Sequence, residues 1–200
     1  RLVADIRAVM GDEDIVLADT GAIKMWMARL YPTYAPLTCL ISNGLSTMGF
    51  SLPGAIGAHL AHPDRKVLAV MGDGSFLMNS QEMETAVREN IPLKILVWVD
   101  DSYGLIKWKE QEQFGGEHCY VDFSNPDFKL LAEAMRCKGY RVEKAEELIP
   151  TLEEAFKQDV YTPEYATGFK ILGADNTAST LIQVSNPWQG AKDVKMSYFI

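Results

Sequence analysis

The chain has 200 residues, of which 48% are hydrophobic and 23% are charged, a composition typical of a globular protein with one sizeable core. It has no run of eighteen apolar residues, so the sequence predicts no membrane span. The 27 acidic and 19 basic side chains give a formal net charge of −8, which disfavours nucleic-acid binding because phosphates repel an acidic surface.

The cysteines and the N-terminus bear on the compartment. Cys39, Cys119 and Cys137 share no CxxC spacing, and an odd number of cysteines cannot all pair within one chain. This pattern favours a reducing, cytoplasmic environment. The chain starts at Arg1 with no secretory leader pattern, and the absence of an initiator Met predicts a fragment of a longer protein.

Short apolar runs alternate with helical patterns along most of the chain. Strands are expected at residues 15–18, 38–41, 66–71, 94–99 and 139–142, and the first four of these runs read as buried on both faces. Helices are expected at residues 52–62, 80–90, 127–136 and 146–158, with Asn79 and Glu82 at the spacing of a capping box. The alternation predicts an α/β fold, in which a parallel sheet is flanked by helices on both faces.

Two acidic turns follow neighbouring strands of this expected sheet. Gly72-Asp73-Gly74-Ser75 comes directly after one strand, and Asp100 begins the turn after the next, one strand-helix-strand unit later. Because the carboxyl ends of parallel strands meet at one edge, the two carboxylates are expected to converge there. An all-oxygen ligand set suits Mg²⁺ or Ca²⁺, and Mg²⁺ commonly completes its shell with phosphate oxygens. The glycines and the helix that follows would let the backbone approach such a phosphate.

A structural interpretation of the same residues remains open on spacing alone. Gly-Asp-Gly is a common tight-turn tripeptide, and an acidic strand end often only opens a loop or caps a helix. Met48 alone would be interpreted as a core residue. His59 and His62, at i and i+3, lack a third metal ligand nearby, and Lys24 is interpreted as a surface lysine with no role.

The acidic turns, with the helical residues 82–87 between them, resemble the thiamine-diphosphate motif of the thiamine-dependent carboligases and decarboxylases. Further stretches resemble acetolactate synthases in their C-terminal, diphosphate-binding domain: residues 19–21, 25–29, 41–44, 47–49 and 52–58. The resemblance covers about residues 1–160, which we expect to form one domain. Residues 97–100, Val-Trp-Val-Asp, resemble the catabolic, flavin-independent synthases more than the biosynthetic ones.

The resemblance implies a role for each matching residue. Mg²⁺ would be held by Asp73, Asp100 and the carbonyl of Ser102. Thiamine diphosphate would be bound by Ser46, Met48, Gly72, Asp73, Gly74, Ser75, Asp100, Ser102, Tyr103 and Gly104. Met48, beneath the cofactor rings, and Leu105, facing the substrate, are the implied catalytic-site residues, and the Ser46 carbonyl would accept from the aminopyrimidine amino group. Leu105 stands where such synthases often have Met.

The implied activity is decarboxylation of pyruvate or another 2-keto acid and transfer of the two-carbon unit to a second keto acid. In this family the acid–base Glu belongs to a separate N-terminal pyrimidine-binding domain, contributed across a homodimer or homotetramer interface, and the sequence contains no such domain. Two alternatives remain: another 2-keto acid decarboxylase or carboligase, or a Mg²⁺-dependent non-catalytic binding module. The order of the acidic residues argues against a receiver-like module.

Residues 161–200 differ in character from the rest. Thr, Gly, Asn and Ser surround two short β-like runs, at 169–172 and 181–184. One interpretation is a divergent last strand, with 181–184 in the missing strand's place. The other, which we favour, is a foreign segment, because it faintly resembles the mature N-terminus of periplasmic iron-complex binding proteins.

Overall fold

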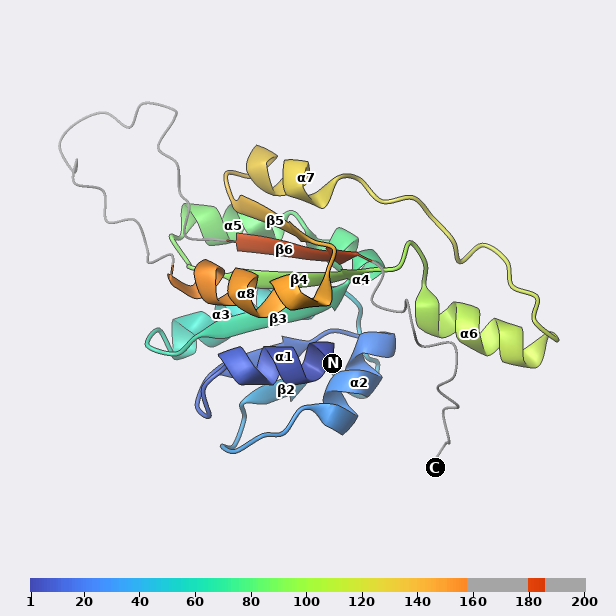
Figure 1. Ribbon diagram of the computed structural model, residues 1–200, viewed down its shortest axis with the longest axis horizontal. Helices are drawn as coiled ribbons and strands as arrows, with labels where there is room; N and C mark the ends of the chain where they lie inside the picture. The colour runs from blue at the N-terminus through green and yellow to red at the C-terminus, as the bar shows by residue number, and fades with distance from the viewer. Residues whose placement is uncertain (158–179, 186–200) are drawn as a thin grey trace.

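A computed structural model describes residues 1–157 and 180–185 of the chain (Figure 1). The strands are β1 (Ile15–Ala18), β2 (Cys39–Ile41), β3 (Val67–Gly72), β4 (Lys94–Val99), β5 (Lys138–Val142) and β6 (Thr180–Ser185). They form one sheet in the order β2-β1-β3-β4-β6-β5, and every neighbouring pair is parallel. The expected α/β class with a parallel sheet is confirmed.

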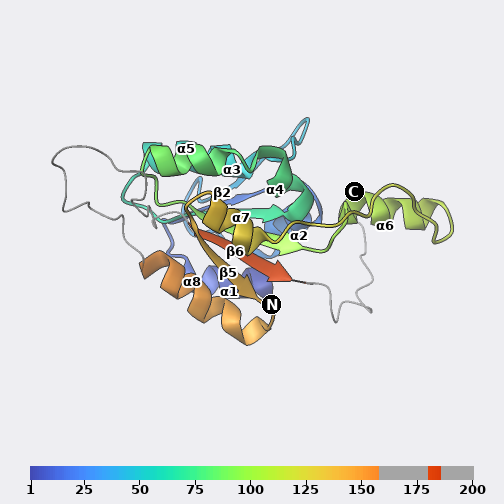
Figure 2. The ribbon, with the colours of Figure 1, turned by 90° about the horizontal axis from the view of Figure 1, so that it is seen from above.

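Helices cover both faces of the sheet, as Figure 2 shows. One face packs against α1 (Leu2–Val9), α2 (Ala22–Leu30) and α8 (Leu148–Lys157), which follows a short 3₁₀ turn at Ala145–Glu147. The other face packs against α3 (Ser51–Ala61), α4 (Asp73–Asn79), α5 (Glu82–Arg88) and α7 (Phe128–Ala134). Among the α-helices of the described ranges, α6 (Gly104–Gln113) alone projects away from the sheet, and it has no buried residue.

The strands show why two layers of helices are needed. Along β4, Ile95 and Val97 belong to one core and Leu96 and Trp98 to the other, because successive side chains point to opposite faces. Burial of each large aliphatic side chain contributes about 1.5–3 kcal/mol relative to exposure. The two cores therefore hold the strand ends in fixed positions, and the acidic turns begin at those ends.

Two details differ from the sequence-based expectation. β2 is an edge strand with half-buried residues, because only β1 pairs with it. The expected capping box is wrong: Asn79 is the last residue of α4, and its Nδ2 donates to the carbonyl of Gly49 at 3.0 Å. The residue before α5 is Gln81, which makes no side-chain cap.

The last strand lies inside the sheet, between β4 and β5. Such a strand is what the interpretation of 181–184 as a divergent last strand requires. The β-like run at 169–172 and most of residues 161–200 lie outside the described residues, so a division of the chain near residue 160 stays a prediction.

Within the described ranges, no helix has the length and apolar character needed to cross a bilayer.

Candidate functional site

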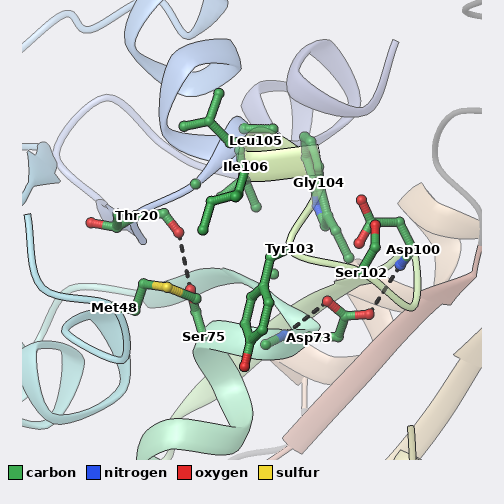
Figure 3. Close-up of a pocket in the computed structure, with 16 residues that line it drawn as sticks. Thr20, Met48, Asp73, Ser75, Asp100, Ser102, Tyr103, Gly104, Leu105 and Ile106 are labelled. Atoms are coloured by element: carbon green, nitrogen blue, oxygen red, sulfur yellow. Dashed lines mark hydrogen bonds between the residues drawn. The ribbon is translucent and has the colours of Figure 1, made fainter. Parts of the chain in front are cut away.

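A cavity of about 150 Å³ lies at the carboxyl ends of β1, β3 and β4 (Figure 3). Ligand sites of open parallel sheets occur at this edge. All but one of the site residues expected from the sequence line it, namely Met48, Gly72, Asp73, Gly74, Ser75, Asp100, Ser102, Tyr103, Gly104 and Leu105. Thr20, Gly21, Ala22, Ile23, Trp98 and Ile106 complete the wall and were not expected as site residues.

The Asp73 carboxylate joins the ends of β3 and β4. Asp73 is 1% exposed, and its Oδ1 accepts from the backbone N–H of Gly74 at 2.8 Å. Its Oδ2 accepts from the N–H of Asp100 at 3.1 Å (Figure 3). The same oxygen accepts from the N–H of Asp101 at 2.8 Å. Hydrogen bonds from several amides compensate for burying this charge. The two acidic turns therefore meet at one carboxylate.

The turn after β4 presents Asp100 and Ser102 to the same cavity. An antiparallel bridge aligns Ser102 with Asp122, through hydrogen bonds from Tyr103 N–H to the Val121 carbonyl and from Phe123 N–H to the Asp101 carbonyl. In this pairing the carbonyl of Ser102 itself points away from residues 121–123. That orientation is compatible with its implied use as a metal ligand.

The glycines of the site serve different purposes. A Cβ on Gly72 would meet nothing within 4 Å, so it would extend into open space along the cavity wall. A Cβ on Gly74 would lie 2.7 Å from Cε1 of Tyr103, and one on Gly104 would lie 2.6 Å from Oδ2 of Asp100. Gly74 thus leaves room for the Tyr103 ring, and Gly104 leaves room for the Asp100 carboxylate.

Met48 reaches the cavity because a buried carboxylate holds its loop. Asp19, 0% exposed, follows β1 and accepts from the backbone N–H of Gly49 at 2.9 Å and of Ser51 at 2.7 Å. Ser75 Oγ donates to the carbonyl of Thr20 at 3.0 Å, which ties α4 to the same turn. Asp19 was not expected to act here, although an Asp directly after a strand is the pattern that drew attention to Asp73.

Ser46 does not line the cavity. Its backbone is left-handed, with a φ of 48°, and its Oγ accepts from Nζ of Lys24 at 2.8 Å. Lys24 Nζ also donates to the carbonyl of Ser42 at 2.8 Å. The interpretation of Lys24 as a surface lysine without a role is therefore wrong, because Lys24 forms hydrogen bonds with the loop that precedes Met48.

The side chains present suit Mg²⁺ with a phosphorylated ligand. Two carboxylates and a carbonyl form an all-oxygen donor set, and Gly72 leaves open space beside them. Among residues 1–157 and 180–185, no group of three or more His, Cys, Asp or Glu side chains is placed to hold a metal. A cation at Asp73 and Asp100 would thus depend on backbone, water and ligand oxygens, as Mg²⁺ usually does.

Comparison with known proteins identifies the domain. The family model described as "Thiamine pyrophosphate enzyme, C-terminal TPP binding domain" matches residues 19–162. The chain belongs to this family. Thiamine diphosphate is therefore the cofactor that this family binds, and the expected relationship to thiamine-dependent enzymes is confirmed.

Relatives of this thiamine pyrophosphate-binding domain are longer proteins. The chain is 37% identical over 158 residues to "Acetolactate synthase" of Bacillus subtilis and 40% identical over 159 residues to "Acetolactate synthase, catabolic" of Raoultella terrigena. These alignments cover 79% and 80% of the chain but 28% of each relative. A thiamine diphosphate-dependent 4-hydroxybenzoylformate decarboxylase of Rhodococcus jostii superposes with a TM-score of 0.75 at 26% identity, over 92% of this chain and 31% of that one.

Proposed function

We propose that this chain is the diphosphate-binding part of a thiamine-diphosphate-dependent carboligase of the acetolactate synthase type, acting on pyruvate or another 2-keto acid. The observation that carries the proposal is the Asp73 carboxylate, which the amides of Asp100 and Asp101 hold at the cavity. The relatives named acetolactate synthase support the reaction type.

Several cavity residues have a proposed task. Asp73, Asp100 and the Ser102 carbonyl hold Mg²⁺, whose charge offsets that of a diphosphate seated along residues 72–75. Met48 supports the cofactor rings, while Leu105 and Ile106 line the substrate side and exclude water. Thiamine diphosphate supplies the carbanion chemistry that lets a 2-keto acid lose CO₂ and join a second carbonyl compound.

A second protein surface completes the proposed site. Asp73 and Asp100 are the only carboxylates among the described residues of the cavity wall, and both are assigned to Mg²⁺. We therefore place the acid–base Glu on a pyrimidine-binding domain, supplied across a homodimer or homotetramer interface. The segments that form the wall also expose apolar side chains, namely Leu45, Leu77, Met78, Ile106 and Phe114. Exposed apolar groups of this kind mark interaction surfaces.

We place this enzyme in the cytoplasm. Cys39, Cys119 and Cys137 are all free thiols, as a reducing compartment would maintain them.

Calorimetric titration of the chain with thiamine diphosphate tests the proposal. Binding is expected with Mg²⁺ present, and it should disappear with a chelator or when unphosphorylated thiamine replaces the diphosphate. Cofactor binding that does not depend on Mg²⁺ would contradict the proposal. Phosphorylation of an Asp by acetyl phosphate would also contradict it and would favour a regulatory binding module.

A further inference from the structure

Asn125 lies in the loop before α7, outside the cavity wall, and contacts both acidic turns. Its Nδ2 donates to Oδ2 of Asp73 at 2.7 Å and to Oδ1 of Asp101 at 2.7 Å. Carboxylates only accept hydrogen bonds, so the amide nitrogen must be the atom that faces them. One side chain therefore links the ends of β3 and β4 to a third segment of the chain.

The hydrogen bonds on Asp73 are unequal between its two oxygens. Oδ2 accepts three, from Asn125 and from the N–H groups of Asp100 and Asp101, whereas Oδ1 accepts one, from Gly74. Three donors crowd Oδ2 and leave it no open approach for a cation, whereas the single donor on Oδ1 leaves that oxygen accessible. Oδ2 is thus saturated, and Oδ1 is the oxygen with capacity left for a cation.

Asn125 also supports the turn that carries Ser102. Asp101 has a left-handed backbone with a φ of 54°, a conformation that costs energy for a residue other than Gly. Asp101 is held at its Oδ1 by Asn125, at its N–H by Asp73 and at its carbonyl by the N–H of Phe123. Removing Asn125 takes away one of these three restraints on the residue beside Ser102.

The loop holds Asn125 firmly in place. Pro126 restricts the residue before it to extended conformations. Asp127 caps α7 by accepting from the N–H of Lys129 at 2.9 Å and of Leu130 at 3.1 Å, and it pairs with Arg141 at 2.9 Å. The amide can therefore orient Asp73 rather than follow it.

We propose that Asn125 is a positioning residue that makes the cation site selective for Mg²⁺ over Ca²⁺. As the third donor to Oδ2, beside the N–H groups of Asp100 and Asp101, Asn125 closes that oxygen to a cation and leaves Asp73 a single ligating oxygen, which suits the octahedral shell of Mg²⁺. Ca²⁺ tolerates bidentate carboxylates and higher coordination numbers, so a released Asp73 favours Ca²⁺. This inference rests on the proposed function of the cavity as a Mg²⁺–diphosphate site.

The test compares two cations on the full 200-residue chain and on Asn125→Ala. At a fixed millimolar concentration of thiamine diphosphate, the half-saturating concentrations of Mg²⁺ and Ca²⁺ are measured by calorimetry. Loss of an outer ligand partner typically weakens metal binding about 10- to 100-fold, and we expect this loss for Mg²⁺. The loss for Ca²⁺ should be smaller, so the affinity ratio shifts towards Ca²⁺. Ser124→Ala, at the exposed neighbouring position, is the matched control and should change neither value.

Each outcome separates two hypotheses. A wild-type chain that binds no Mg²⁺ with the diphosphate contradicts the proposed function itself. A wild-type chain that binds it, with an Asn125→Ala variant whose Mg²⁺/Ca²⁺ ratio is unchanged, contradicts only the positioning role, whatever the melting temperature does. If the Ala variant does not fold, Asn125→Ser, too short to reach both carboxylates, should shift the ratio in the same direction, and an unchanged ratio there overturns the inference.

Discussion

Asp19 and Asp73 are stabilised in the same way but have different roles. Each directly follows the apolar run of a buried strand, is almost fully buried, and accepts hydrogen bonds from backbone amides of another loop. Only Asp73 also lines the cavity. Asp19 therefore organises the loop of Met48, whereas Asp73 organises the turn after β4 and, in the proposed site, would offer an oxygen to Mg²⁺.

The change Asp73→Ala should abolish Mg²⁺-dependent binding of thiamine diphosphate, because one of two carboxylates that balance the cation is lost. Asp100→Asn should cause a milder loss, since the amide carbonyl oxygen can still ligate. Titration calorimetry at saturating Mg²⁺ measures both. Asp64→Ala, at an exposed position, serves as control, and unaltered cofactor affinity in Asp73→Ala would rule out the assignment.

Met48→Ala should lower turnover far more than cofactor affinity, because in the proposed site Met48 shapes the ring end and the diphosphate is anchored at residues 72–75. Steady-state kinetics and cofactor titration on the enzyme assembled with its pyrimidine domain give the two values. Leu60→Ala, at an exposed position near the end of α3 and outside the cavity wall, is the control. Equal losses of turnover and affinity would instead mark Met48 as a packing residue, whose truncation costs about 2–5 kcal/mol of stability.

At the scale of elements, the loop between β2 and α3 depends on Asp19. Asp19→Ala leaves the N–H groups of Gly49 and Ser51 without their acceptor. Each unpaired buried group costs about 1–3 kcal/mol, so loss of the acceptor for these two groups should lower the free energy of unfolding by about 2–6 kcal/mol. Urea denaturation measures this, and cofactor affinity should fall too as Met48 loses its anchor. A variant as stable as Asp64→Ala would show that the loop does not need this carboxylate.

The start of α7 should be sensitive to acid. The N–H of Leu130, together with Arg141 and the N–H of Lys129, lowers the pKa of Asp127 below its ordinary value. A carboxyl whose pKa is lower in the folded state stabilises the fold above its unfolded pKa, near 4, and loses this effect as pH falls through the folded value.

Asp127→Asn keeps a capping oxygen but loses the charge and the ion pair with Arg141. Its melting temperature should lie below that of the wild type at pH 7, and the difference should vanish as the pH approaches 2. Thermal melts between pH 7 and pH 2 test this, with Glu133→Gln on the exposed side of the same helix as control. A difference that persists at pH 2 would show that the charge of Asp127 is not what stabilises α7.

At the scale of the whole molecule, the proposed function makes the cavity the half of the site that binds the diphosphate. By itself the 200-residue chain should bind thiamine diphosphate weakly and form no acetolactate from pyruvate, because the aminopyrimidine ring would face solvent. Adding a pyrimidine-binding domain with its Glu should restore carboligation, measured as acetolactate formed per unit time. Turnover by the chain alone at an ordinary enzymatic rate, on the order of 1–10³ per second, would overturn this account of the catalytic base.

Local patterns predicted the central architecture well. β1 and β4 begin and end at the residues expected from their apolar runs, and β3 is displaced by one residue. The helices α1, α2, α4 and α6 were not predicted. The helix α4 begins at Asp73, and α6 begins directly after the turn at residues 100–103. Because these stretches were interpreted as turns, the helices that begin there were not recognised.

The sequence by itself determined the class of fold, the family and the two acidic strand ends, because buried parallel strands and Gly-Asp-Gly turns are local signals. Three contacts were decided only by the tertiary structure. Asp19 accepts a hydrogen bond from the Met48 loop, Lys24 donates to residues 42 and 46, and Asn125 donates to Asp73. These contacts join segments that are 18 to 52 residues apart. Hydrogen bonds from a side chain to a distant backbone or side-chain atom leave no periodic trace in a sequence, since their geometry exists only once the sheet has aligned the strand ends.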